Sequence, residues 1–156
     1  MIPTKNSLSI KQYIKDKPIR WGLKTFLLTD SEHGYIVNAE IYTGKREDGT
    51  AIENLGVTGN LVVRMTEGFH HQDYNVFTDR FYTSVQLAEY LVNHGIGLCG
   101  TAMTNRKLFP KCLKKTNKQM QKGESEMLFN GKVAAFVWMD KKAIYVGLLC
   151  HINLCG

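Results

Sequence analysis

The sequence contains no apolar run that approaches the ~18 residues needed to span a membrane, and its first residues lack the apolar centre of a secretory signal. It has no Asn-x-Ser/Thr sequon, and its four cysteines form no Cys-x-x-Cys pair. Free thiols in a reducing compartment are the simplest interpretation of this cysteine spacing. We therefore expect a nuclear or cytoplasmic protein that is not secreted and has no membrane partner.

Acidic residues are missing from one long stretch. Between Tyr90 and Gly123 there is no acid, although the whole chain carries a net charge of +6. The basic residues of this stretch are Arg106, Lys107, Lys111, Lys114, Lys115, Lys118 and Lys122. The remaining 13 basic and 14 acidic residues nearly cancel. A local basic patch is typical of a protein that contacts phosphate backbones, which makes the residues from Arg106 to Lys118 candidate DNA ligands. A solvated, lysine-rich connector is the alternative.

A length of 156 residues fits one domain, residues 1–156. Hydrophobic patterning predicts strands at Lys24–Thr29, Tyr35–Tyr42, Tyr74–Thr78, Ile96–Met103, Met127–Phe129, Val133–Trp138 and Ala143–Leu149, and helices at Leu55–Thr66 and Val85–Asn93. Thr83 or Ser84 is expected to cap the second helix, and Asn130-Gly131 to form a hairpin turn. Strands that alternate with helices indicate an α/β domain.

Asp79 is the first candidate site residue. It directly follows the apolar run Tyr74–Thr78, and the carboxyl ends of strands are where ligands and metals gather in open α/β sheets. An aspartate after a strand also serves as a turn or helix-cap residue, and that alternative stays open here. Two-metal catalysis on phosphodiesters needs several converging acids, whereas this part of the sequence offers only Asp79.

Three other motifs are weaker. The residues Gly95–Gly100 spell GxGxxG, but a helix precedes them and a strand follows, which is the reverse of a dinucleotide site. The cysteines and histidine of the stretch 150–155 lack a fourth zinc ligand and the usual spacing. The pair His70-His71 near Asp73 is a surface pair with little indication of metal binding. None of these motifs predicts a site.

Several short motifs occur in a fixed order along the chain. They are Met1-Ile2-Pro3, Lys11-Gln12-Tyr13-Ile14, Lys17–Gly22, Asp30-Ser31, Tyr42-Thr43-Gly44, Asp79–Ser84, Gly100-Thr101, Asn105-Arg106-Lys107, Gly123-Glu124-Ser125 and Asp140-Lys141-Lys142. In this order the chain resembles the piggyBac transposase domain, and it is similar to piggyBac transposable element-derived proteins of the type-4-like group. The resemblance runs to about Val146. Arg80 stands where the family more commonly has Asn.

The resemblance implies an incomplete RNase H-like domain, an α/β fold with a mixed sheet, flanking helices and a short β-rich C-terminal part. Enzymes of this DDE/DDD type cut and join DNA with three aspartates and two Mg²⁺ ions. Asp79 matches the second aspartate, as a catalytic and metal-binding residue. The first and third would lie upstream of Met1 and downstream of Gly156.

Because one carboxylate does not position two ions for in-line displacement, we expect a catalytically inactive transposase fragment that does not bind Mg²⁺ productively. Its DNA affinity should be weak and independent of sequence. A domesticated DNA- or protein-binding module is the alternative, and an active strand-transfer enzyme would require a longer parent chain. The resemblance also predicts that Lys24–Thr29, Tyr35–Tyr42 and Tyr74–Thr78 share one mixed sheet, with the Val85–Asn93 helix packed on it.

Overall fold

The computed structural model describes residues 1–44, 52–114 and 119–149. The chain divides into two compact units, an N-terminal unit, Met1–Thr50, and a C-terminal unit, Ala51–Gly156. Within the described residues, no helix combines the length and the apolar character that crossing a membrane requires.

The N-terminal unit consists of two small antiparallel sheets. Its strands are β1 (Ile2–Pro3), β2 (Gln12–Tyr13), β3 (Trp21–Leu23), β4 (Thr25–Thr29) and β5 (Ile36–Ile41). The first three form a sheet in the order β1-β3-β2, and β4 pairs with β5 as a hairpin. The hairpin turn is closed by Asp30, whose Oδ2 accepts the backbone N–H of His33 at 2.7 Å. Gly22 is the one buried residue among residues 1–44.

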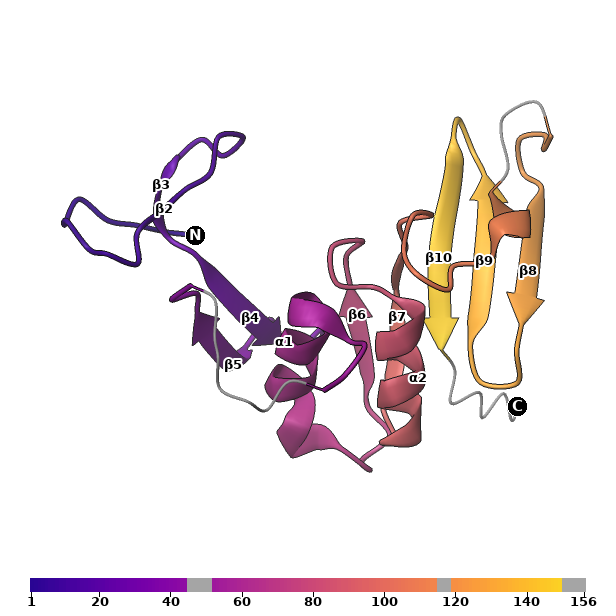
Figure 1. Cartoon of the computed structure of the whole chain (residues 1–156), viewed down its shortest axis with the longest axis horizontal. Helices are drawn as coiled ribbons and strands as arrows, with labels where there is room; N and C mark the ends of the chain where they lie inside the picture. The colour runs from indigo at the N-terminus through magenta and orange to yellow at the C-terminus, as the bar shows by residue number, and fades with distance from the viewer. Residues whose placement is uncertain (45–51, 115–118, 150–156) are drawn as a thin grey trace. The chain divides into compact units, whose positions relative to one another are not determined.

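The C-terminal unit is built on a five-stranded mixed sheet. Its elements are α1 (Gly56–Thr66), η1 (Glu67–Phe69), β6 (Asn75–Thr78), α2 (Val85–Asn93), β7 (Gly97–Thr101), η2 (Lys111–Leu113), β8 (Ser125–Phe129), β9 (Ala134–Met139) and β10 (Ala143–Leu149). The strand order is β6-β7-β10-β9-β8. Strands β6 and β7 are parallel and joined through α2, whereas the other pairings are antiparallel (Figure 1).

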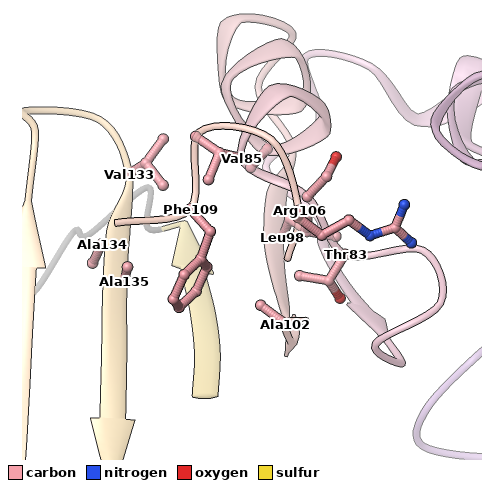
Figure 2. A pocket seen from close by; sticks show the side chains of 11 residues that line it. Thr83, Val85, Leu98, Ala102, Arg106, Phe109, Val133, Ala134 and Ala135 are labelled. Carbon is pink, nitrogen blue, oxygen red and sulfur yellow. The ribbon is translucent and has the colours of Figure 1, made fainter. Parts of the chain in front are cut away.

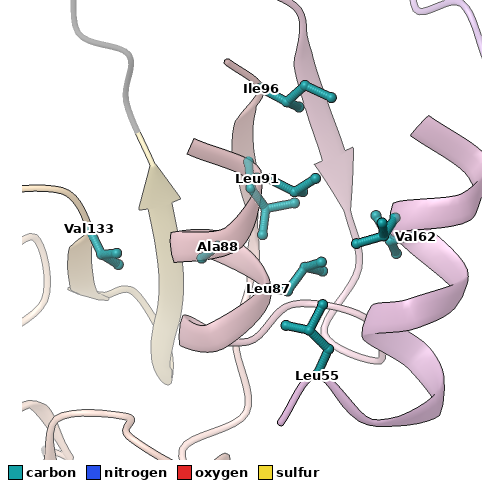
Figure 3. Close-up of a cluster of buried hydrophobic side chains, with 9 residues drawn as sticks. Leu55, Val62, Leu87, Ala88, Leu91, Ile96 and Val133 are labelled. Atoms are coloured by element: carbon teal, nitrogen blue, oxygen red, sulfur yellow. The ribbon is translucent and has the colours of Figure 1, made fainter. Parts of the chain in front are cut away.

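Helix α2 forms where a capping residue precedes an amphipathic segment. The Ser84 hydroxyl accepts the backbone N–H of Leu87 at 3.2 Å, which satisfies one of the unpaired donors of the first turn. Leu87 and Leu91 share one helical face, and both are fully buried. They pack with side chains from α1, β7 and the loop before β9, among them Val62, Leu98 and Val133, to form the first core of the unit (Figure 3).

A second core lies under the segment that follows β7. Phe109, Leu113 and Met120 are buried against strand β9, where their partners are Ala135, Val137 and Met139. The Phe109 ring meets the ring of Tyr145 on β10 edge-to-face at 5.8 Å. The described part of the acid-free stretch is therefore anchored on the sheet by apolar side chains, and is not a free connector.

Most local elements occur where the sequence predicts them, including both helices, the strand before Asp79 and the three C-terminal strands. The prediction that Lys24–Thr29 and Tyr35–Tyr42 share a sheet with Tyr74–Thr78 is wrong. Strands β4 and β5 pair only with each other, while β6 pairs with β7. A hairpin with a short turn satisfies its own backbone groups locally, and none of the described strands links β4 to β6.

Candidate functional site

Asp79 opens a tight turn at the carboxyl end of β6. Its Oδ1 atom accepts the backbone N–H of Phe81 at 2.7 Å. Its carbonyl oxygen accepts the backbone N–H groups of Tyr82 and Thr83, both at 3.1 Å. We call residues 79–83 the Asp79 turn. The carboxylate is exposed, and one of its oxygens is occupied in shaping the turn, as an Asx residue does.

Thr83 folds the turn back over the neighbouring strand. Its hydroxyl donates to the Asp79 carbonyl at 2.9 Å and shares a hydrogen bond of 2.8 Å with the Thr78 hydroxyl. This pair lies over Gly100 of β7, which is in register with Thr78. A Cβ on Gly100 would lie 2.2 Å from the Thr78 carbonyl oxygen and 2.5 Å from the Thr83 hydroxyl. The turn therefore requires a glycine at position 100.

Arg106 reaches the same turn from the segment after β7. Its Nη2 donates to the carbonyl oxygen of Phe81. Beside it lies a cavity of about 20 Å³, large enough for one water molecule but not for a substrate. In Figure 2, Arg106 and Thr83 lie together on one side of this cavity, and Phe109 lies on the side of Ala134 and Ala135.

The pKa of Tyr82 responds to the charge of the Asp79 turn. Burial raises the pKa of its phenol, and the charge of the Asp79 carboxylate raises that pKa further. Both causes disfavour a phenolate next to an existing negative charge. Tyr82 therefore stays a neutral neighbour of Asp79 at physiological pH and does not compete with it for a cation.

The described residues do not fit a two-ion magnesium site. No group of three His, Cys, Asp or Glu side chains within them is placed to hold a metal ion. Asp79 offers one carboxylate, of which Oδ1 already accepts the Phe81 N–H. Magnesium needs near-octahedral oxygen ligands, and a pair of ions needs several bridging carboxylates. Among the described residues, a metal-dependent step therefore lacks the ligands that it needs.

The structure separates the six predicted DNA-binding residues into groups. Lys107, Lys111 and Lys114 are exposed on the segment anchored by Phe109 and Leu113. Arg106 is half-buried and turned toward the Asp79 turn. Lys115 and Lys118 lie outside the described residues.

A histidine cluster went unpredicted because its third member comes from a different element. The rings of His70 and His94 are 4.9 Å apart, and the His94 ring stacks on Tyr90 at 4.1 Å. Burial lowers the pKa of His70, and the charges of His94 and His71 lower it further, against an opposing effect of Glu67. From the sequence, His70 and His71 were expected to be only a surface pair. No sequence signal indicated that His94, at the end of α2, lies beside them.

The sequence matches one protein family and two human proteins. The sequence family described as Transposase IS4 matches residues 1–150. The human PiggyBac transposable element-derived protein 3 is 34% identical over 104 residues, which cover 65% of this chain and 17% of that protein. The human Chimeric ERCC6-PGBD3 protein is also 34% identical over 104 residues, covering 65% of this chain and 10% of its own length.

One solved structure shares the fold. It is the cryo-EM structure of a piggyBac transposase synaptic complex with hairpin DNA, with a TM-score of 0.82 and 23% sequence identity. The match covers 97% of this chain and 32% of that chain. At this identity the likeness shows the fold alone, and it confirms the expected RNase H-like α/β class. The chain spans a third or less of each of these three proteins.

Proposed function

The chain belongs to the Transposase IS4 family, and we propose that it is a catalytically inactive part of a piggyBac-type DNA transposase domain. The observation that carries the proposal is the position of Asp79. It follows β6 at the edge where the parallel strands β6 and β7 both end, and within the described residues it stands without the partner acids that a metal site needs. We assign to it the role of the family's second metal-binding aspartate.

The chemistry explains why one such acid does not suffice. Two-ion catalysis needs carboxylates that hold both ions in line with the attacking and leaving oxygens. In the resemblance described above, Asp79 is the only one of the three aspartates that has a counterpart among these 156 residues. The 156 residues by themselves are therefore proposed to retain the frame of the site without its complete ligand set.

The test is a cleavage assay with the purified chain, supercoiled plasmid and either Mg²⁺ or Mn²⁺. We expect no nicking and no strand transfer above a protein-free control. The matched variant is Asp79→Ala, purified in the same way to expose any contaminating nuclease. Metal-dependent nicking by the parent chain that disappears in the variant would overturn the proposal, because other acids would then complete the site.

We also propose that the basic segment binds DNA weakly and independently of sequence, and that this binding takes place in the nucleus. The support is the arrangement of Lys107, Lys111 and Lys114, which are exposed on a segment whose apolar residues are packed against the sheet. Cations on an anchored segment contact phosphates with less loss of entropy than cations on a free connector do. This function does not depend on catalysis and would suit a domesticated binding module equally well.

Salt-dependent binding to a random-sequence duplex tests this second function. Replacing Lys111, Lys114, Lys115 and Lys118 by Gln should abolish most of the affinity. It should also flatten the dependence of affinity on salt, by about 0.9 in logarithmic slope for each phosphate that the variant no longer neutralises. The control replaces Lys5, Lys15, Lys17 and Lys142, which changes the net charge equally. If both variants bind alike, the basic segment is not the contact surface.

A further inference from the structure

Arg106 differs from the other basic residues of its segment. Its backbone N–H donates to the Met103 carbonyl at 3.1 Å, and its own carbonyl accepts the N–H of Phe109 at 3.2 Å. The base of the side chain is therefore fixed in a turn beside the second core. From there the guanidinium reaches the carbonyl of Phe81, 25 residues earlier in the chain.

We propose that Arg106 is a positioning residue that holds the Asp79 turn in place, an inference that rests on the proposed metal-binding role of Asp79. Hydrogen bonds to Asp79 shape the turn, the Thr78–Thr83 hydroxyl pair ties it to β6, and Tyr82 packs against the first core. The bond from Arg106 joins it to the segment that follows β7. A charged donor makes a stronger hydrogen bond than a neutral one.

The partial burial of Arg106 supports this assignment over a role in binding DNA. Its Nε is buried and has no hydrogen-bond partner among the described residues. A side chain that leaves a donor unsatisfied is held by its surroundings, because that donor would be hydrated if the guanidinium were free in solvent. The neighbouring Lys107 is exposed. Within the Asn105-Arg106-Lys107 motif, the arginine therefore holds the Asp79 turn and the lysine faces solvent.

The geometry links the ends of two parallel strands. Asp79 follows β6, and Arg106 lies five residues after the end of β7. Gly100 leaves room for the Thr83 hydroxyl between them. Because the Phe81 carbonyl and the Phe81 N–H belong to one residue, fixing the first restricts the second, which donates to Asp79 Oδ1. Arg106 thereby limits the directions in which the Asp79 carboxylate can point.

The test compares Arg106→Met with Lys107→Met in the full chain by NMR, without metal or DNA. The Met side chain keeps the apolar stem of Arg106 and removes its donors. We expect the amides of Phe81, Tyr82 and Thr83 to exchange with water about tenfold faster in Arg106→Met. The Hα–Hβ coupling constants of Asp79 should change from values typical of a single side-chain rotamer to values averaged over several rotamers. Lys107→Met should leave both readouts unchanged.

A role limited to general stability would predict a different result. The amide of Leu87, held by Ser84, serves as the reference within the same region, and its exchange should stay constant. Unchanged exchange and couplings at the Asp79 turn in a folded Arg106→Met variant would overturn the proposal. If that variant does not fold, Arg106→Lys decides, because it keeps the charge but lacks the guanidinium fork. Exchange at the three amides should still rise by a smaller factor, and parent-like exchange would refute the proposal.

Failure of this inference and failure of the proposed function remain distinguishable. The NMR experiment reports only whether Arg106 fixes the turn, whereas the plasmid assay reports whether the chain cleaves DNA. A turn that stays fixed without Arg106 leaves the assignment of Asp79 intact. Cleavage that depends on Asp79 would overturn the proposed inactivity and leave the positioning role of Arg106 standing.

Discussion

The two units of this chain contrast in how they hold their strands together. In the N-terminal unit, five short strands pair in two small sheets, and Gly22 alone is buried among residues 1–44. In the C-terminal unit, five strands and two helices enclose two apolar cores. Among the described residues, every buried hydrophobic side chain lies at or beyond Leu55.

This difference shows that backbone pairing and burial are separable contributions. Hairpins and short ladders satisfy hydrogen bonds in both units, but each such bond adds little net free energy in water. Burial of apolar surface supplies most of the stability of a domain. The frame of the Asp79 turn therefore lies in the unit that has the cores, and the N-terminal unit should unfold more easily. Each unit contains one tryptophan, Trp21 or Trp138, so single-tryptophan variants report on them separately.

The largest expected effect is that of Leu91→Ala. Leu91 is 0% exposed in the first core, and removing a fully buried leucine side chain costs about 2–5 kcal/mol of unfolding free energy. Trp138 fluorescence during urea unfolding should show this loss. The control is Ile36→Ala in β5, where the side chain is 62% exposed and Trp21 should report almost no change. Equal losses in the two units would mean that the N-terminal unit has a core of its own.

A pair of glycines sharpens the comparison. Gly100→Ala puts a methyl group against the Thr78 carbonyl in the middle of the mixed sheet, and we expect a loss of roughly 1–3 kcal/mol. Gly22→Ala creates a similar overlap, 2.4 Å from the Ile2 carbonyl, but against a two-residue terminal strand that can move away. Trp138-monitored unfolding should therefore respond to the first substitution, and Trp21-monitored unfolding only weakly to the second. A strong response at Gly22 would contradict the picture of a loosely held N-terminal sheet.

A smaller effect is expected from the cap of α2. Ser84→Ala removes the acceptor for the Leu87 N–H and should cost about 1 kcal/mol in the unfolding of the C-terminal unit. Ser84→Asp serves as the control, because Asp also caps helices well and should retain most of the stability. An unchanged unfolding midpoint for Ser84→Ala would show that the packing of Leu87 and Leu91 alone determines where the helix starts.

The smallest expected effect is a pH dependence of the C-terminal unit that comes from His70. The pKa of His70 is lowered in the folded chain, so the unfolded chain binds the proton more readily below about pH 6.5. Stability should therefore fall as the pH drops below that value, and level off below the folded-state pKa of His70. His70→Gln should reduce this slope in Trp138-monitored unfolding. The control is His33→Gln in the N-terminal unit, which should leave the Trp138 signal unchanged.

The sequence by itself predicted what depends on neighbours a few residues away. The apolar run before Asp79, the Ser84 cap and the helix after it are local patterns, and each occurs where expected. Asn130-Gly131 likewise lies in the β8–β9 connection, where the Asn130 side chain accepts the N–H groups of Lys132 and Val133. The ordered motifs were enough to identify the family, because a family resemblance depends on order along the chain and not on contacts in space.

Only the tertiary structure decided which distant residues meet. It put β4–β5 and β6 in different sheets, buried Phe109 and Leu113 under the basic segment, and brought His94 to His70. It also turned Arg106 toward the Phe81 carbonyl, although in the sequence Arg106 resembles its lysine neighbours. These outcomes depend on burial and on hydrogen bonds between segments tens of residues apart. No local pattern encodes such contacts, because they are chosen by the free energy of the whole packed unit.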